Sequence, residues 1–274
     1  MKQKLLLCLI LIATLFIGAS CTNKKGGEEV KEEPKFTTVS KGFDNLEELG
    51  NYRTEIVLQG IYGEENSEDE FSATILQSGD LRKVQLIVSS FALNFYMVTE
   101  EESDYVLFAP SDFGAEYEGY VKATIDELKD LFIGSDGTSD ELDISMLDEL
   151  IDFLDNLQDS YFDLGDDEYY VFNQTGKDAI KPILENLKNE ISGGEETIDT
   201  VDIDATVKIK TNKTYITNMK VELTATEAKV ENGEEQTITM LYTFDRFGEV
   251  EIKKPTNISS FEDFMKELEN NPIQ

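Results

Sequence analysis

The chain has 274 residues, 57 of them acidic and 24 basic, with no histidine and a formal net charge of −33. This charge disfavours nucleic acid and anionic membrane surfaces as partners, because both need clustered lysine or arginine side chains. The lack of histidine removes Ser-His-Asp catalysis and imidazole metal sites, and the only cysteines are Cys8 and Cys21. Asp/Glu pairs, Ser-Lys dyads and carboxylate metal centres survive this exclusion, so enzymatic function is restricted rather than ruled out. Because the sequence contains no convincing motif for any of them, we expect no enzymatic activity, no cofactor, no metal and no nucleic-acid partner.

The first 20 residues have the order of a secretory signal. Lys2 and Lys4 precede an apolar run at residues 5–18, and small residues end the segment at 18–20. The run is too short to span a bilayer comfortably. Cys21 follows directly, and this arrangement resembles the lipobox of bacterial lipoproteins. The resemblance implies cleavage before Cys21, with lipid attached to its thiol; a secreted protein with a chance cysteine is the alternative.

Residues 21–41 are expected to form a lipidated, disordered tether. Between residues 22 and 33 the only apolar side chain is Val30, so the segment cannot bury enough surface to offset its ordering entropy. A flexible coil of about 20 residues places the folded part on the order of 25 Å from the membrane. A single domain at residues 42–274 follows, anchored to the membrane through the Cys21 acyl chains.

The first half of this domain is predicted to be an antiparallel meander. Apolar and polar residues alternate at 52–58 and 71–76, the turn Ser78-Gly79-Asp80 leads into 81–88, and further strands are expected at 93–99 and 105–109. The strand at 93–99 is apolar on both faces, with Leu93, Phe95 and Met97 alternating with Tyr96 and Val98. A strand of this kind is covered on both sides or borders a cavity.

The middle of the chain is predicted to be helical. Thr124 and Glu127 form a capping box, and a second helix with a wide apolar stripe runs to about residue 157. After a strand at 169–172, a third helix follows with its apolar face between residues 180 and 191. Pro182 is placed near its start, because a proline inside a helix costs about 3 kcal/mol.

The C-terminal third returns to strands with clean alternation at residues 203–209, 219–225 and 238–244. Asn232-Gly233 is a strong hairpin turn. The pattern predicts a sheet with one apolar face and one face of threonine, lysine and glutamate. A helix capped by Ser259 and Glu262 closes the chain.

The order of strands, helices, strands and helix predicts an α+β fold. Eight or nine antiparallel strands tend to curl because twist accumulates, so we expect a strongly curved sheet, a half-barrel, with helices over its concave face. Such a fold can leave an apolar hollow. Periodicity suggests the following lining residues, each of which can equally be ordinary core: Met146, Leu150, Phe153, Leu154, Ile180, Leu184, Met219 and Met240.

The pattern also resembles the LolA/LolB and LppX/LprG-like group of bacterial lipid-binding lipoproteins. The resemblance rests on Asn51-Tyr52-Arg53, the long meander, the acidic leucine-rich central helices and a last strand containing Phe247-Gly248, Val250, Ile252 and Pro255. It implies a monomeric, non-enzymatic half-barrel that binds or carries a lipid or another apolar molecule. The protein would be extracytoplasmic, on the outer membrane where the host has one. A surface module that binds a partner protein or cell-wall component through an acidic face is the alternative.

Overall fold

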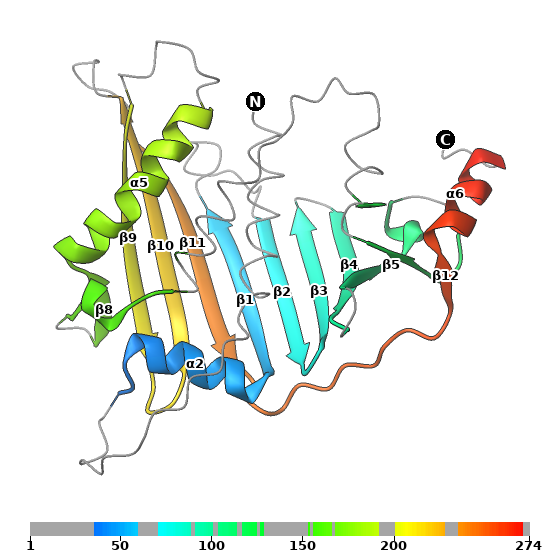
Figure 1. Ribbon diagram of the computed structural model, residues 1–274, viewed down its shortest axis with the longest axis horizontal. Helices are drawn as coiled ribbons and strands as arrows, with labels where there is room; N and C mark the ends of the chain where they lie inside the picture. The colour runs from blue at the N-terminus through cyan, green and yellow to red at the C-terminus, as the bar shows by residue number, and fades with distance from the viewer. Residues whose placement is uncertain are drawn as a thin grey trace. The chain divides into compact units, whose positions relative to one another are not determined.

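The fold is α+β and is built on one large sheet (Figure 1). A computed structural model of the chain describes residues 36–59, 71–88, 91–100, 104–113, 117–124, 127–128, 153, 156–165, 168–191, 201–227 and 235–270. Across these ranges, 12 strands form a sheet that is not closed into a barrel, and three α-helices accompany it. The predicted class is confirmed, whereas the predicted eight or nine strands were too few. In the described part of the chain, no helix has the length and apolar character needed to cross a membrane.

The strand order is β12-β6-β5-β4-β3-β2-β1-β11-β10-β9-β8-β7. The hairpin-linked strands pair antiparallel, and β12 pairs parallel with β6. The three strands that sequence analysis missed are short: β6 (Tyr120–Ala123), β7 (Phe162–Leu164) and β12 (Ile258–Ser260). Each has only three or four residues, which leaves little room for a recognisable alternation.

The chain divides into two compact units. The first unit comprises Met1–Glu48, Ile56–Glu68 and Asp143–Phe244; the second comprises Leu49–Glu55, Asp69–Leu142 and Asp245–Gln274. Strand β1 (Asn51–Gln59) contributes to both. Its alternation is as predicted, because Thr54, Ile56 and Leu58 are buried and the residues between them are only partly buried.

The second unit contains the predicted meander. Its strands are β2 (Phe71–Ser78), β3 (Leu81–Val88), β4 (Phe91–Val98) and β5 (Tyr105–Phe108). Ser78 pairs with Leu81, so Gly79 and Asp80 form a two-residue turn, and Gly79 has a φ of 59° that suits glycine. The predicted hairpin is therefore confirmed.

Strands β4 and β5 are covered on both faces, as their sequence predicts. On one face Tyr96, Val98, Tyr105 and Leu107 form a buried cluster. On the other face Phe108, Val121 and Ala123 pack with Phe264. Phe264 belongs to α6 (Phe261–Asn270). This helix is capped by Ser260, whose hydroxyl accepts the backbone N–H of Asp263, so the predicted box at Ser259 and Glu262 is wrong by one residue.

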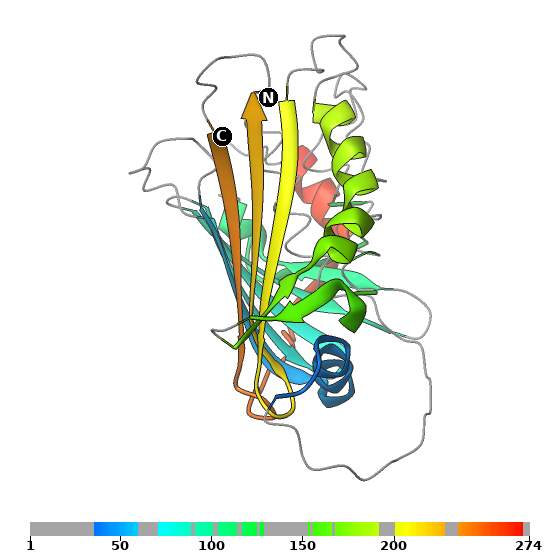
Figure 2. The ribbon, with the colours of Figure 1, turned by 90° about the vertical axis from the view of Figure 1, so that its left-hand side faces the viewer.

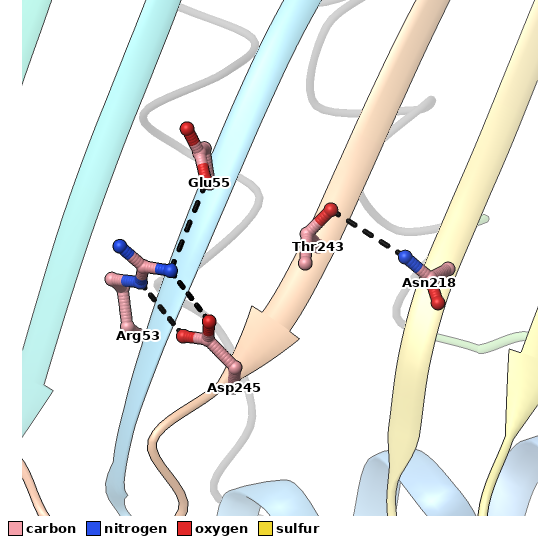
Figure 3. A network of polar contacts seen from close by, with 5 residues as sticks. All are labelled: Arg53, Glu55, Asn218, Thr243 and Asp245. Atoms are coloured by element: carbon pink, nitrogen blue, oxygen red, sulfur yellow. Dashed lines mark hydrogen bonds and ion pairs between the residues drawn. The ribbon is translucent and has the colours of Figure 1, made fainter.

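The segment after β11 is not the last strand that sequence analysis predicted. Strand β11 (Glu235–Asp245) ends where Asp245 forms a two-pronged ion pair with Arg53, at 2.7 and 2.5 Å (Figure 3). This hydrogen bonding raises the pKa of Arg53. Residues 246–257 then run without regular pairing. The Asn51 side chain both donates to and accepts from the backbone of Val250, at 2.8 Å each, and so takes the place of a partner strand.

Further along, this C-terminal segment packs against the cluster around Tyr105. Ile252 contacts that cluster, and Lys254 donates to the Tyr105 hydroxyl, which donates in turn to Glu100. The hydrogen bond from Tyr105, together with nearby Lys254, lowers the pKa of Glu100. The alternation of Val250 and Ile252 therefore reflects packing on a sheet face rather than a place in the sheet.

The first unit contains β7, β8 (Tyr169–Phe172), β9 (Val201–Thr211), β10 (Ile216–Glu227) and most of β11. Along β9 the buried residues are Ala205, Val207, Ile209 and Thr211, with partly exposed residues between Ala205 and Thr211. In β10 the buried Met219 and Val221 alternate with partly exposed residues, and in β11 the buried Met240, Tyr242 and Phe244 do the same. One face is therefore apolar and the other polar, which confirms the prediction.

Two helices belong to this unit. Helix α2 (Val39–Leu49) begins within the segment that the sequence analysis assigned to the tether, and Val39 is fully buried. Helix α5 (Gln174–Ile191) is capped by the Asn173 side chain, which accepts the N–H of Gly176. Pro182 lies inside α5, so its predicted place near the start is wrong. The Thr124–Glu127 capping box is confirmed, but most of the central helices predicted up to residue 157 lie outside the described residues.

Candidate functional site

The predicted lining residues that the structure describes all lie in the first unit. Phe153 is half-buried, and the other four are buried: Ile180, Leu184, Met219 and Met240. Cys21, the predicted lipid attachment site, and Met146, Leu150 and Leu154 lie outside the described residues. The candidate site therefore comprises the apolar face of β9–β11 together with α5.

The two methionines share the apolar sheet face. Met219 pairs with Tyr242 across β10 and β11, and Val221 pairs with Met240, so the methionines lie diagonal to each other. On the other side of β10, Met219 pairs with Ile209 and Val221 with Val207. All six side chains are buried. They form a continuous apolar surface across three strands, because directly opposed residues point to the same face.

Tyr242 is the one residue of these six that has a hydroxyl group. Its side chain is 2 % exposed, and its hydroxyl lies 3.7 Å from the Met240 Sδ, to which it donates. Burial raises the pKa of Tyr242 well above its ordinary value. The hydroxyl is therefore neutral throughout the physiological range, and a thioether is only a weak acceptor for it.

Helix α5 runs alongside β9, as Figures 1 and 2 both show. Ile180 and Leu184 are one turn apart and form its buried stripe, while Lys181 and Pro182 between them are exposed. Near the start of α5, Gly176 allows a close approach, because a Cβ there would lie 2.6 Å from the Tyr161 carbonyl oxygen and 3.0 Å from the Phe172 ring. The first turn of α5 is thus fixed against β8 and the 3₁₀ turn η2 (Asp159–Tyr161).

Aromatic rings gather at this end of the helix. The Phe153 ring stacks on Tyr161 with centroids 5.9 Å apart and meets Phe172 edge-on at 6.2 Å. Phe162 lies 4.9 Å from Phe172. Such pairs add about 0.5–1.5 kcal/mol each beyond area burial. Phe153, the one described lining residue from the central segment, therefore belongs to an aromatic cluster with Tyr161 and Phe172.

The segment before α2 is fastened to the same unit. The Thr37 carbonyl accepts from the buried Thr211 hydroxyl at 2.9 Å and from Tyr170 at 3.2 Å. Burial and the nearby Asp159 raise the pKa of Tyr170. Within α2, Gly42 allows the helix to approach Ile216, whose Cγ1 would lie 2.9 Å from an added Cβ. These contacts hold α2 at the β9–β10 turn.

The chemistry available in the described residues is that of an apolar surface. Besides the Tyr242 hydroxyl, the residues recorded as buried include the polar Thr37, Thr54 and Thr211, and no carboxylate is among the described residues whose side chains are recorded as buried. In the same ranges, no cluster of three or more histidine, cysteine, aspartate or glutamate residues could hold a metal ion. The buried surface of β9–β11 can make dispersion and hydrophobic contacts.

No protein-family model matches this chain, and no curated protein matches it either. The resemblance to lipid-binding lipoproteins therefore stays a prediction.

Sequence analysis missed Tyr242 and Phe172 as members of the site. Tyr242 was assigned to the correct face of its strand, but nothing in the sequence paired it with Met219. Phe172 lies in a four-residue strand, where the close approach of Gly176 places it under α5. Gly176, three residues after the capping Asn173, is the one sequence feature that could have indicated tight packing there.

Proposed function

We propose that this protein binds or carries a lipid or another apolar molecule, without catalysis, while held outside the cytoplasm by an acyl anchor on Cys21. In this proposal the sheet is curved, and α5 with the central helices covers its apolar face. The ligand lies between that face and the helices, as a monomeric half-barrel carrier would hold it.

The observation that supports this proposal best is the apolar face of β9–β11. Three long strands of 11 or 12 residues present buried aliphatic side chains in register, with two methionines at their centre. Methionine adapts to partners of varied shape, because its side chain is unbranched and polarisable. A hydrocarbon chain needs contacts of this kind and few polar groups.

The anchor is supported by the sequence order of signal, small residues and Cys21. Stable attachment to a bilayer takes more than one acyl chain, and a lipidated N-terminal cysteine supplies several. The following polar residues give the reach that an anchored carrier needs.

Native mass spectrometry of the full chain, purified in mild detergent, tests ligand binding. We expect a species heavier than the protein by the mass of one lipid, and uptake of a fluorescent fatty acid after that lipid is extracted. A protein that carries no added mass and takes up no fatty acid would refute the binding proposal.

The anchor is tested separately with Cys21→Ser. We expect this variant to lose metabolic labelling by a radioactive fatty acid and to leave the membrane fraction, while its uptake of fluorescent fatty acid is unchanged. Continued labelling of Cys21→Ser would refute the anchor without bearing on the ligand.

A further inference from the structure

Strand β7 is the last strand at one end of the sheet, and within the described ranges no strand pairs with its outer side. Leu164 of β7 pairs with Tyr170, and at the next position the Gly165 N–H bonds to the Tyr169 carbonyl. Because bonded and non-bonded pairs alternate along an antiparallel ladder, the Leu164 pair is a non-bonded one. The N–H and C=O of Leu164 therefore point away from β8, toward the open edge.

The side chain of Leu164 is exposed at the same place. It is 57 % exposed, compared with 39 % for Ile87 and 38 % for Ile258. Proteins commonly protect edge strands with proline, lysine, a bulge or a covering segment. Strand β7 has the sequence Phe-Asp-Leu, so its protection is its short length and the charge of Asp163. That charge repels acidic segments but not basic ones.

The open edge is acidic. Residues 155–168 contain six acidic residues and no basic ones. Among them, Asp159 and Asp163 are exposed, and Asp163 directly precedes Leu164 on β7. A second copy that paired through its own β7 would bring the same acids to the edge, and like charges placed opposite each other are destabilising. A basic segment of another protein is the complementary occupant.

The lysines of neighbouring elements do not cancel this charge at the edge. Lys208 and Lys210 lie on β9, two strands in from β7. With strands about 4.8 Å apart, a segment added outside β7 would lie about 14 Å from β9. Screening at physiological salt acts over about 8 Å. The Lys210 amino group lies 5.4 Å from the centre of the Tyr169 ring on β8, and Lys177 is paired with Asp204 at 3.4 Å.

We propose that β7 docks an extended, basic segment of a partner protein, a function separate from apolar ligand binding. The segment adds to the sheet as a further strand, and its backbone bonds to the N–H and C=O of Leu164. The partner residue opposite Leu164 is apolar and covers the leucine side chain. The residues on either side of it are lysine or arginine, because they point to the face of the sheet that carries Asp163.

The experiment measures binding of a short labelled peptide, in which lysine alternates with valine, to the full chain in mild detergent. Fluorescence anisotropy should show saturable binding. Methylation of the valine backbone nitrogens keeps the sequence and charge but removes the donors that strand addition needs. We expect this methylated peptide to bind about tenfold more weakly, as the loss of one or two hydrogen bonds predicts.

Matched variants of the protein locate the binding. Leu164→Pro removes the outward N–H and the exposed side chain without removing a bond to β8, and should weaken binding about tenfold. Its control is Ile258→Pro, at the exposed apolar residue of β12 at the other end of the sheet, which should bind like wild type. Asp163→Asn should weaken binding about threefold, whereas Glu267→Gln, at an exposed position of α6, should leave it unchanged.

Several results would overturn the proposal. These are no binding by the wild-type chain, equal binding of the methylated peptide, equal loss in Ile258→Pro, or equally tight binding of a peptide in which glutamate replaces lysine. If Leu164→Pro does not fold, the methylated peptide decides alone. Self-association of the wild-type chain that Leu164→Pro abolishes would also overturn the proposal, since the occupant of the edge would then be a second copy.

Discussion

Replacement of Ala205 by phenylalanine distinguishes a hollow from a filled core beneath the apolar face. Ala205 lies on that face of β9, is 1 % exposed and pairs with Leu223. In a hollow, the ring would bury on the order of 100 Å² more apolar surface than alanine does, which stabilises the fold by about 2.5 kcal/mol at 25 cal/mol per Å². In a filled core, the same ring would overpack the interior and cost about 1–3 kcal/mol.

The proposed function predicts stabilisation. The sign of the change in the free energy of unfolding therefore distinguishes a hollow from a filled core. Urea unfolding of the delipidated protein measures the free energy, and uptake of a fluorescent fatty acid measures the space left. We expect Ala205→Phe to raise the free energy of unfolding by about 2.5 kcal/mol and to reduce uptake. Thr206→Phe, on the polar face one residue along, should change both quantities little, with stability within about 0.5 kcal/mol. A destabilised Ala205→Phe protein with unchanged uptake would refute the reasoning.

Three further predictions concern single side chains. Asn51→Ala removes both hydrogen bonds to the C-terminal segment and should lower the free energy of unfolding by about 2 kcal/mol, whereas Asn218→Ala, which loses one bond of 3.4 Å, should lower it by less than about 0.5 kcal/mol in the same urea titration. Burial raises the pKa of Tyr242, so its neutral form contributes stability fully below about pH 10 and less as pH rises; Tyr242→Phe should therefore lose less stability than wild type between pH 9 and about 11. The lowered pKa of Glu100 means that its contribution is present above pH 4.5 and is lost as pH falls, so the melting temperatures of wild type and Glu100→Gln should converge in acid; a constant difference would contradict this.

Strand faces followed from the sequence, whereas strand register did not. The face of a residue depends on a local alternation of period two, which is why Met219, Met240 and Tyr242 were assigned correctly. A two-residue turn at Asn232-Gly233 would place Met219 opposite Arg246, yet it lies opposite Tyr242. The two registers differ by four residues. Because this is an even number, each residue keeps its face of the sheet while its cross-strand partner changes.

The C-terminal segment shows a second limit of local pattern. Val250 and Ile252 alternate with charged residues as a strand would, but the backbone of Val250 bonds to the side chain of Asn51, about 200 residues earlier in the chain. A side chain that hydrogen-bonds to a backbone segment, as a partner strand would, produces no periodic pattern in the sequence. Short strands such as β7 and β12 were not predicted for a related reason: they are defined by pairing with a neighbouring strand rather than by their composition.

Pro182 is the clearest conflict between local preference and the fold, and it leads to a last prediction. Proline lacks the N–H that would reach the carbonyl of Asp178, and its ring crowds that carbonyl. Pro182 is exposed, so water can reach the freed carbonyl, while Ile180 and Leu184 on either side are buried. Burial of those two residues therefore outweighs an unfavourable local choice.

Pro182→Ala should stabilise the protein by about 2 kcal/mol, since about 3 kcal/mol of helix propensity is recovered and up to about 1 kcal/mol is lost through a freer unfolded chain. Lys181→Ala, at the exposed neighbour, is the control and should stay within about 0.5 kcal/mol of wild type in urea unfolding. A Pro182→Ala protein no more stable than this control would refute this reasoning, because the proline would then cost α5 little in its folded setting.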